Sequence, residues 1–139
     1  MIETIQKNEY DIAFSAVENI LQQPVEQIEL SGNIPPLDEL SDSNDVFKGK
    51  LSVLFVDIRK STELTDEISI KKMVKVYRAF SRVVIQAIRY SGGFARQFAG
   101  DGIMGVFQDD SETEEKQTSS EKAVTAARYI LTLIDYCLN

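Results

Sequence analysis

Apolar residues follow two different periods along this chain, and the periods predict its secondary structure. Residues 51–56 (LSVLFV) form a short run rich in Val, Leu and Phe, which predicts a buried β-strand. Residues 94–98 and 103–107 are too short to be helices, and the link between them, Ala-Gly-Asp-Gly, is a hairpin signal. The pattern therefore predicts one strand followed, further along the chain, by an antiparallel hairpin.

Three other segments carry apolar residues at three- and four-residue steps, the spacing of an amphipathic helix. The first should end before Pro24, and the second should end at Ser91, Gly92 and Gly93. The apolar positions of the three faces are Tyr10, Ala13, Val17, Ile20 and Leu21; Ile70, Met73, Val74, Tyr77, Phe80, Val84, Ala87 and Ile88; and Ala123, Ala126, Ala127, Ile130, Leu131 and Ile134.

The remaining segments connect these elements. Residues 31–36 and 41–45 are turn-rich and polar, so residues 1–48 are interpreted as a helix followed by a linker arm. That helix has an apolar face to bury, either on a folded domain or in a separate regulatory contact. Residues 108–120 hold five carboxylates and are interpreted as a solvated loop, because their spacing does not match a calcium loop. Residues 49–139 then form a domain with the order β-α-β-β-α.

Composition narrows the class of protein. The chain has 139 residues, of which 43% are hydrophobic and 27% charged, as expected for one modest domain. A net charge of −7 argues against a nucleic-acid or anionic-membrane surface. Cys137 is the sole cysteine, no apolar run approaches the roughly 20 residues that span a bilayer, and the N-terminus lacks a signal-peptide pattern. A cytoplasmic protein without membrane insertion is the expectation.

Two aspartates are the candidate chemistry. Asp57 directly follows the predicted strand, and Asp101 sits in the hairpin turn. If the hairpin lies beside the strand, the two carboxylates converge; alone, each acid could be an ordinary loop or turn residue. The chain has no histidine, and oxygen-only ligands favour Mg²⁺ or Mn²⁺ completed by water and substrate phosphate. The pair therefore suggests metal-assisted phosphoryl chemistry.

Two blocks around these aspartates carry a family resemblance. Residues 55–62 (FVDIRKST) and 92–104 (GGFARQFAGDGIM), in this order and separated by a long helix, resemble the first half of a class III nucleotidyl cyclase catalytic domain. The resemblance implies that Asp57 and Asp101 bind two divalent ions, Mg²⁺ or Mn²⁺, with help from the carbonyl of Ile58. It also implies a phosphorus-oxygen lyase reaction, in which the ribose 3′-hydroxyl attacks the α-phosphorus and pyrophosphate leaves.

The loop after Asp57 is expected to hold the triphosphate in such an enzyme. Its residues are Arg59, Lys60, Ser61 and Thr62. A helix N-terminus offers free amides to phosphate, so Ser61 and Thr62 could bind phosphate, cap the next helix, or do both. Arg59 and Lys60 could touch phosphate or face solvent.

The resemblance implies an α+β fold, a ferredoxin-like β-α-β-β-α(-β) core that stops after its second helix. The family's second half supplies a base-reading residue and a transition-state Asn and Arg, for which no positions match here. We therefore expect this chain alone to be a poor cyclase, and either to be a fragment or to have the edge of strand 51–56 covered by another chain. Because class III sites form between two subunits, the expected assembly is a head-to-tail homodimer.

The base of the substrate is the least determined feature. Adenylate cyclases resemble one another in carrying Lys four residues before the second aspartate, and guanylate cyclases in carrying Glu, whereas this chain has Gln97. Arg96 and Gln97 are the candidates for contacting the base, and a glutamine amide can pair with uracil or cytosine as readily as with a purine. The short lead-in helix and Ile-Pro-Pro arm resemble the bacterial pyrimidine cyclases of antiphage defence, which make cyclic UMP or cyclic CMP for a separate effector.

Other classes remain to be weighed. An adenylate cyclase is the first alternative, and a cyclase-like module that only dimerises or binds nucleotide is the second. A diguanylate cyclase would show Gly-Gly-Asp/Glu-Glu-Phe at its hairpin, which this chain lacks. A receiver domain would need further acidic residues and a later Lys that the strand ends do not supply.

Overall fold

The computed structural model describes residues 7–30, 34–99, 101–110 and 116–138, and the side chains of residues 7 and 97–99 lie outside this description. The chain divides into two compact units, Met1–Gly49 and Lys50–Asn139, and each is described by itself. None of the described helices combines the length and the apolar composition needed to cross a lipid bilayer.

The first unit contains one long helix and a small parallel strand pair. Helix α1 (Lys7–Gln22) is followed by strand β1 (Gln27–Glu29), the 3-10 helix η1 (Leu37–Glu39) and strand β2 (Val46–Lys48). β1 and β2 pair in parallel, with Ile28 opposite Phe47. The unit therefore contains a strand pair in addition to its helix.

Two sequence predictions for this unit have different outcomes. The helix and its end before Pro24 are confirmed, because α1 stops at Gln22. The linker arm stays a prediction, because the strand pair at residues 27–29 and 46–48, too short for periodicity to reveal, flanks the segments interpreted as the arm. Residues 31–33 of the predicted arm lie outside the described residues. Tyr10, Val17 and Leu21 of α1 are exposed, and what covers them stays a prediction.

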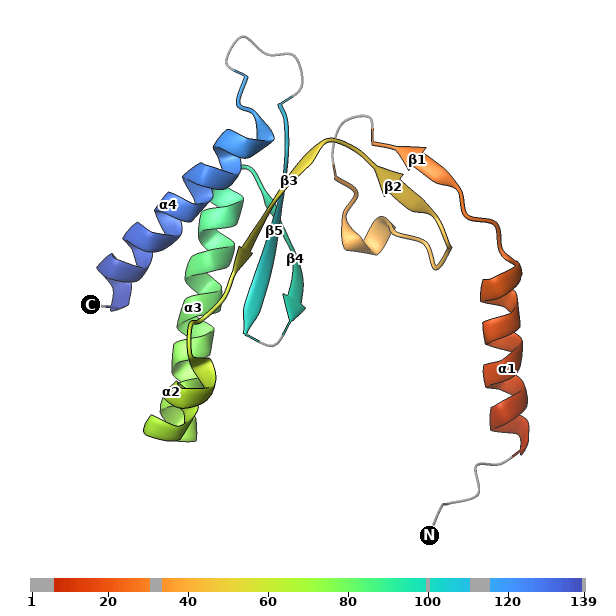
Figure 1. Cartoon of the computed structure of the whole chain (residues 1–139), viewed down its shortest axis with the longest axis horizontal. Helices are drawn as coiled ribbons and strands as arrows, with labels where there is room; N and C mark the ends of the chain where they lie inside the picture. Colours follow the sequence, from red (N-terminus) through yellow and green to blue (C-terminus); the bar gives the residue numbers. More distant parts are fainter. Residues whose placement is uncertain (1–6, 31–33, 100, 111–115, 139) are drawn as a thin grey trace. The chain divides into compact units, whose positions relative to one another are not determined.

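The second unit has the predicted α+β class. Its elements are β3 (Leu51–Val56), α2 (Ser61–Glu67), α3 (Ile70–Tyr90), β4 (Phe94–Ala99), β5 (Gly102–Gln108) and α4 (Ser119–Leu138). The predicted order β-α-β-β-α is confirmed, with the short helix α2 as an addition (Figure 1). α3 and α4 pack against each other and against the same sheet.

The three strands form one antiparallel sheet in the order β3-β5-β4. β4 and β5 form the predicted hairpin, with Phe94 opposite Val106 and a register shift between Ala95 and Gln97. β3 pairs with β5, and Val56 lies opposite Ile103. The register therefore brings the C-terminal end of β3 to the tip of the hairpin.

The core lies between the sheet and the two long helices. Phe107 and Ile103 of β5 pack with Val84 and Ile88 of α3, and all four side chains are at most 2% exposed. A Cβ on Gly93 would lie only 2.3 Å from a ring carbon of Phe107. A glycine is required there because the buried ring leaves no room for a side chain.

The prediction that residues 51–56 form a buried strand is wrong for one face. Val53 and Phe55 are 49% and 74% exposed, whereas Leu54 and Val56 pack against the core. The reason is that α3 and α4 contact only one face of the sheet, so alternate side chains of β3 point away from them. Leu131 is a second correction, because it was expected on the apolar face of α4 but is 72% exposed.

The ends of α3 are set by local hydrogen bonds. The Ser69 hydroxyl accepts a hydrogen bond from the backbone N–H of Lys72 and caps the N-terminus. At the other end the N–H groups of Gly92 and Gly93 donate to the carbonyls of Arg89 and Ile88, and Gly92 has a φ of 76°. This is a Schellman motif. It confirms the predicted helix end at residues 91–93, whereas the Ser69 cap separates α3 from α2.

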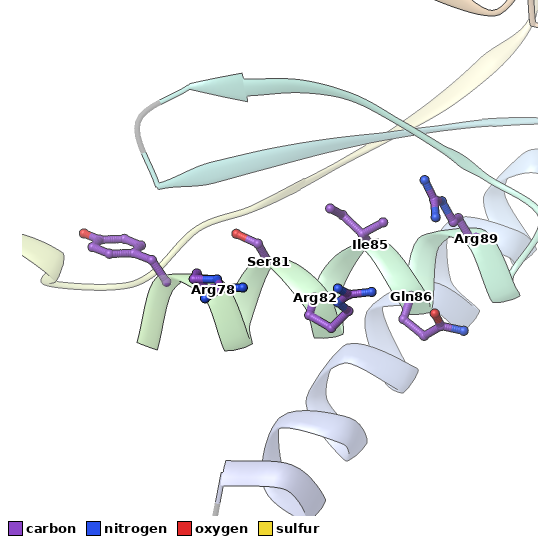
Figure 2. A pocket seen from close by; sticks show the side chains of 7 residues that line it. Arg78, Ser81, Arg82, Ile85, Gln86 and Arg89 are labelled. Carbon is purple, nitrogen blue, oxygen red and sulfur yellow. The ribbon is translucent and has the colours of Figure 1, made fainter. Parts of the chain in front are cut away.

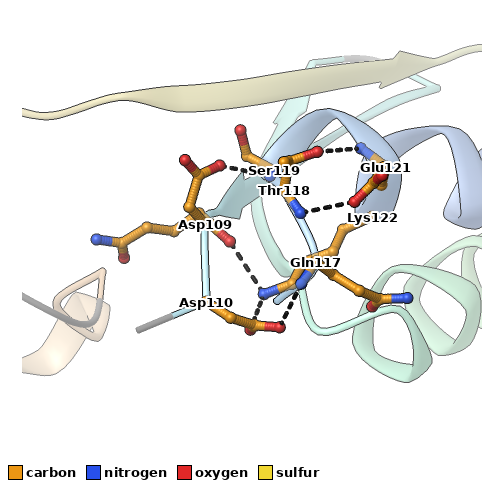
Figure 3. A network of polar contacts seen from close by, with 8 residues as sticks. Asp109, Asp110, Gln117, Thr118, Ser119, Glu121 and Lys122 are labelled. Carbon is orange, nitrogen blue, oxygen red and sulfur yellow. Dashed lines mark hydrogen bonds and ion pairs between the residues drawn. The ribbon is translucent and has the colours of Figure 1, made fainter. Parts of the chain in front are cut away.

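Polar contacts fix the join between β5 and α4 (Figure 3). The Asp109 carboxylate accepts a hydrogen bond from the N–H of Ser119 at 2.6 Å. The Lys122 ammonium pairs with Asp110 and donates to the carbonyl of Gln108. The N–H of Ser119 is the main cause that lowers the pKa of Asp109, and the bond from Lys122 is the main cause for Asp110. The first carboxylates of the predicted acidic loop therefore anchor it; residues 111–115 lie outside the description.

Candidate active site

Asp57 is positioned by the end of β3. It directly follows Val56, the last residue of the strand, and its side chain is exposed. One carboxylate oxygen, Oδ1, accepts a hydrogen bond from the N–H of Ile58 at 2.8 Å. The Ile58 side chain packs against the core, so the backbone just after Asp57 is held in place.

Asp101 lies in the turn between β4 and β5, at the same end of the sheet. Because Val56 is opposite Ile103, the residues that follow β3 meet those that precede β5. Among the influences that lower the pKa of Asp101 is the side chain of Asp57, which places the two side chains near each other. The predicted convergence of the two carboxylates is therefore seen in the geometry, while their roles stay predictions.

The Asp101 carboxyl group is held in its ionised form. The Ser61 hydroxyl is the main cause that lowers its pKa below the ordinary value of 3.8. The N–H of Asp101 itself and the side chain of Asp57 lower the pKa further, and burial opposes them. The other notable property is that Oδ2 of Asp101 is buried without a hydrogen-bond partner. A buried oxygen left in this state costs free energy unless something binds it.

These properties fit a divalent cation. Two adjacent carboxylates repel each other unless a positive charge lies between them, and the unpartnered Oδ2 of Asp101 is free to be a ligand. Among the described residues, no group of three or more acidic or cysteine side chains is placed to hold a metal ion. A cation here would take two protein carboxylates and leave its other positions to water and substrate phosphate, as Mg²⁺ commonly does.

The loop after Asp57 differs from its prediction in one respect. Lys60, with φ 56° and ψ 36°, occupies the N-cap position of α2 in the left-handed region and makes no side-chain cap bond. Ser61 and Thr62 are therefore helical residues, and the interpretation that they cap the helix is wrong. Lys60 pairs with Glu63 at 3.1 Å, but both side chains are largely exposed, so the pair adds little stability. Arg59 is exposed.

Ser61 has a contact that the sequence did not reveal. It was predicted to bind phosphate, and in the folded chain its hydroxyl is the main cause that lowers the pKa of the Asp101 carboxyl. The only signal in the sequence is a hydroxyl residue four positions after Asp57. Thr62, its neighbour in α2, is exposed. Phosphate binding by residues 59–62 remains a prediction.

The predicted base-reading residues lie on β4. The guanidinium carbon of Arg96 lies 4.9 Å from the ring centroid of Phe94, a cation–π contact. Gln97 pairs through its backbone with Met104, and its side chain lies outside the described residues. A role for either residue in base recognition remains a prediction.

Comparison with known proteins gives one informative match. No protein-family model matches the chain. The chain is similar to a uridylate cyclase of Treponema porcinum, with 29% identity over 132 residues. The match covers 94% of this chain and 43% of the relative, so the chain spans less than half the length of that protein.

Proposed function

We propose that this chain carries the metal-binding part of a nucleotidyl cyclase active site. The enzyme would convert a nucleoside triphosphate, with UTP or CTP favoured, into a 3′,5′-cyclic nucleotide and pyrophosphate. The observation that carries the proposal is the register of β3 and β5, which brings Asp57 and Asp101 to one end of the sheet with a buried oxygen of Asp101 unpartnered. The similarity to a uridylate cyclase over most of the chain supports the reaction and the pyrimidine base.

Each residue of the group has a distinct task in this proposal. Asp57 and Asp101 hold two Mg²⁺ or Mn²⁺ ions, with the carbonyl of Ile58. Bound at these residues, such ions would lower the pKa of the ribose 3′-hydroxyl and would offset charge on the phosphates. Ser61 stabilises the ionised form of Asp101, because its hydroxyl lowers the pKa of that carboxyl. The packing of Ile58 against the core keeps the loop in position.

The remaining predicted residues complete the substrate site. Arg59 and Lys60, with the loop that continues through Ser61 and Thr62, bind the triphosphate. Arg96 and Gln97 contact the base. Arg59 and Lys60 are both exposed at the end of β3, which leaves them accessible to a ligand beside Asp57.

The proposed assembly is a head-to-tail homodimer. The exposed side chains of β3, above all Phe55, form an apolar surface that a second copy would cover. The cyclic product would act as a second messenger in antiphage defence and be read by a separate effector. That biological role rests on the resemblance of the lead-in helix and arm to pyrimidine cyclases.

The test of the reaction uses the full-length gene product, Mn²⁺ and each of the four nucleoside triphosphates. Products are identified by chromatography and mass spectrometry for the wild type, Asp101→Asn and a control, Asp42→Asn, whose side chain is exposed in the first unit. We expect cyclic UMP or cyclic CMP from the wild type and the control. The rate should fall by about 10²-fold or more in Asp101→Asn.

Other products would redirect the proposal. Cyclic AMP would identify an adenylate cyclase. Nucleotide binding that needs Mn²⁺ and disappears in Asp57→Ala, without any cyclic product, would indicate a binding module. A rate of cyclic product formation that is the same with a chelator as with Mn²⁺ would contradict the metal site itself.

A further inference from the structure

Helix α3 has a charge unlike that of the rest of the chain. The chain holds 15 Lys and Arg against 22 Asp and Glu. α3 carries six of the basic residues and not one acidic residue. The basic residues are Lys71, Lys72, Lys75, Arg78, Arg82 and Arg89. An acidic protein thus presents one strongly basic helix.

Part of this helix forms the wall of a pocket with a volume of about 450 Å³, which we call the α3 pocket. Its lining residues are Tyr77, Arg78, Ser81, Arg82, Ile85, Gln86 and Arg89. Figure 2 shows the six labelled side chains projecting from successive turns of α3. A pocket of this volume is within the usual range for small-molecule sites.

The three arginines lie on one side of the helix. At about 100° per residue, the spacing of Arg78, Arg82 and Arg89 places them within roughly 40° of one another around the axis. Along the axis, Arg78 and Arg82 are about 6 Å apart, and Arg89 is about 10 Å further on. The first pair can bracket two neighbouring phosphates, and Arg89 can reach the far end of a longer ligand.

These guanidinium groups are available for a ligand. The ion pairs of the described residues involve Lys48, Lys60 and Lys122, and none involves an arginine of the α3 pocket. All three arginines are exposed. A planar guanidinium donates two parallel hydrogen bonds to a phosphate, which makes arginine the residue best suited to this ligand. The hydroxyl of Ser81 and the amide of Gln86 add neutral donors within the same pocket.

We propose that the α3 pocket is a binding site for a linear polyphosphate, either inorganic or carried by a nucleotide. The three arginines line an open groove on one helix that can hold a small anion, and the chain's net charge of −7 disfavours nucleic acid. Charges more than about 8 Å away are largely screened at physiological salt, so the local arginines dominate the attraction of a small anion. Tyr77 and Ile85 offer apolar contact to the organic part of a nucleotide.

This site is independent of the proposed cyclase chemistry. None of its lining residues belongs to the candidate active site, and binding through guanidinium groups needs no metal ion. A measurement in the presence of a chelator therefore separates the two sites. Failure of one proposal leaves the other standing.

The test is isothermal titration calorimetry of the chain in EDTA, with inorganic triphosphate and UTP as separate probes and sulfate as the comparison. We expect triphosphate to bind more tightly than sulfate at equal ionic strength. Arg82→Gln should weaken triphosphate binding by about tenfold or more, because charge-assisted hydrogen bonds are lost. Arg82→Lys keeps the charge but loses the planar fork, so it should also weaken binding. If UTP binds more tightly than inorganic triphosphate, the ligand is a nucleotide. If the two probes bind equally, the ligand is an inorganic polyphosphate.

One control decides the interpretation. Lys71→Gln removes a positive charge from the same helix outside the α3 pocket and should leave the affinity unchanged within roughly twofold. The proposal is overturned if triphosphate does not bind at millimolar concentration, if Arg82→Lys binds like the wild type, or if Lys71→Gln weakens binding as much as Arg82→Gln.

Discussion

The Ser61 hydroxyl and the Asp101 carboxylate are coupled through one hydrogen bond, the strongest influence on the pKa of that carboxyl. A carboxyl whose pKa is lowered by folding stabilises the folded state at pH values above its unfolded pKa. That stabilisation is lost as the pH falls through the lower, folded value. Asp101 therefore contributes to stability at neutral pH and stops contributing in acid, below its ordinary pKa of 3.8.

Replacing Ser61 should change this titration directly. In Ser61→Ala the hydroxyl is absent, so the pKa of Asp101 should rise toward 3.8, and the stabilisation from Asp101 at neutral pH should shrink. Carboxyl ¹³C chemical shifts followed by NMR against pH would measure the change. Thr62→Ala, next in α2 and exposed, is the matched control and should leave the titration of Asp101 in place. An unchanged Asp101 titration in Ser61→Ala would show that the hydroxyl does not act on this carboxyl.

For single residues, the sequence predicted where the candidate functional side chains lie in the fold better than it predicted which other side chains they contact. Asp57 and Asp101 could be placed at a strand end and a hairpin tip because strands and turns are encoded locally. The contact between Ser61 and Asp101 could not be predicted, because it depends on the register in which β3 pairs with β5. Register is a property of two segments far apart in the chain.

In the second unit, local interactions at the ends of the elements stabilise the fold in addition to the packing of apolar faces. α3 ends in a Schellman motif at Gly92, and the following Gly93 lies against the ring of Phe107. The two neighbouring glycines are therefore required for different reasons. Gly92 is required by its backbone conformation, and Gly93 by the space that the buried ring occupies.

Alanine at these two glycines should have different costs. Gly92→Ala should reduce the free energy of unfolding by about 1–2 kcal/mol through its left-handed conformation. Gly93→Ala should cost at least as much, about 1–3 kcal/mol or more, because the new Cβ overlaps a ring with no exposed surface. Urea denaturation measures both. Combining Gly93→Ala with Phe107→Leu should recover part of the lost stability, because the smaller side chain leaves room for the new Cβ. Adding Phe107→Leu to Gly92→Ala should recover none of it. Equal effects of Phe107→Leu in the two backgrounds would contradict steric overlap.

The start of α4 should be sensitive to acid. The pKa values of Asp109 and Asp110 are lowered by the N–H of Ser119 and the ammonium of Lys122, so both carboxylates stabilise the fold at neutral pH. The stability difference between the wild type and the double variant Asp109→Asn, Asp110→Asn should be largest near pH 7. It should shrink as the pH falls below 3.8.

Thermal unfolding followed by circular dichroism from pH 7 to pH 3 would measure this difference. Asp66→Asn, an exposed acid in α2, is the control and should track the wild type. A difference between the wild type and the double variant that does not change with pH would show that the carboxylate charges are not responsible.

Periodicity predicted the helix faces and the strand runs. Two features that it did not predict, a break between two helices and the exposed face of a strand, have physical causes. The break between α2 and α3 is made by the Ser69 cap, which follows only two residues after the last residue of α2. The exposure of Val53 and Phe55 was missed because an apolar run does not say which of its two faces will be covered. That depends on where α3 and α4 pack.

At the scale of the molecule, the sheet of the second unit has one face packed on helices and the alternate side chains of β3 exposed. Leu51, Val53 and Phe55 alternate with residues that face the core. β3 is also an edge strand, since β5 is its only neighbour among the described strands. An apolar edge of this kind favours pairing with another chain, which supports the proposed homodimer.

A charge on this surface should prevent self-association. Phe55→Lys places an ammonium on the exposed side of β3, so the dissociation constant of the homodimer should increase by about tenfold or more. Sedimentation equilibrium at micromolar concentrations measures this constant. Ile70→Lys also replaces an exposed apolar residue and is the control, so it should not change the dissociation constant of the homodimer. A dimer unaffected by Phe55→Lys would place the interface elsewhere, and a wild type that is monomeric throughout would rule out the homodimer.

Lys60 holds a left-handed backbone that costs an ordinary residue roughly 1–2 kcal/mol, and asparagine adopts it more readily. Either lysine codon becomes an asparagine codon by changing one base. Mutation alone would therefore supply the less strained residue often over the history of the gene. If lineages descended from a common ancestor have nevertheless kept lysine here, selection is acting on its ammonium group. If asparagine predominates instead, selection at this position acts only on the backbone conformation of the turn.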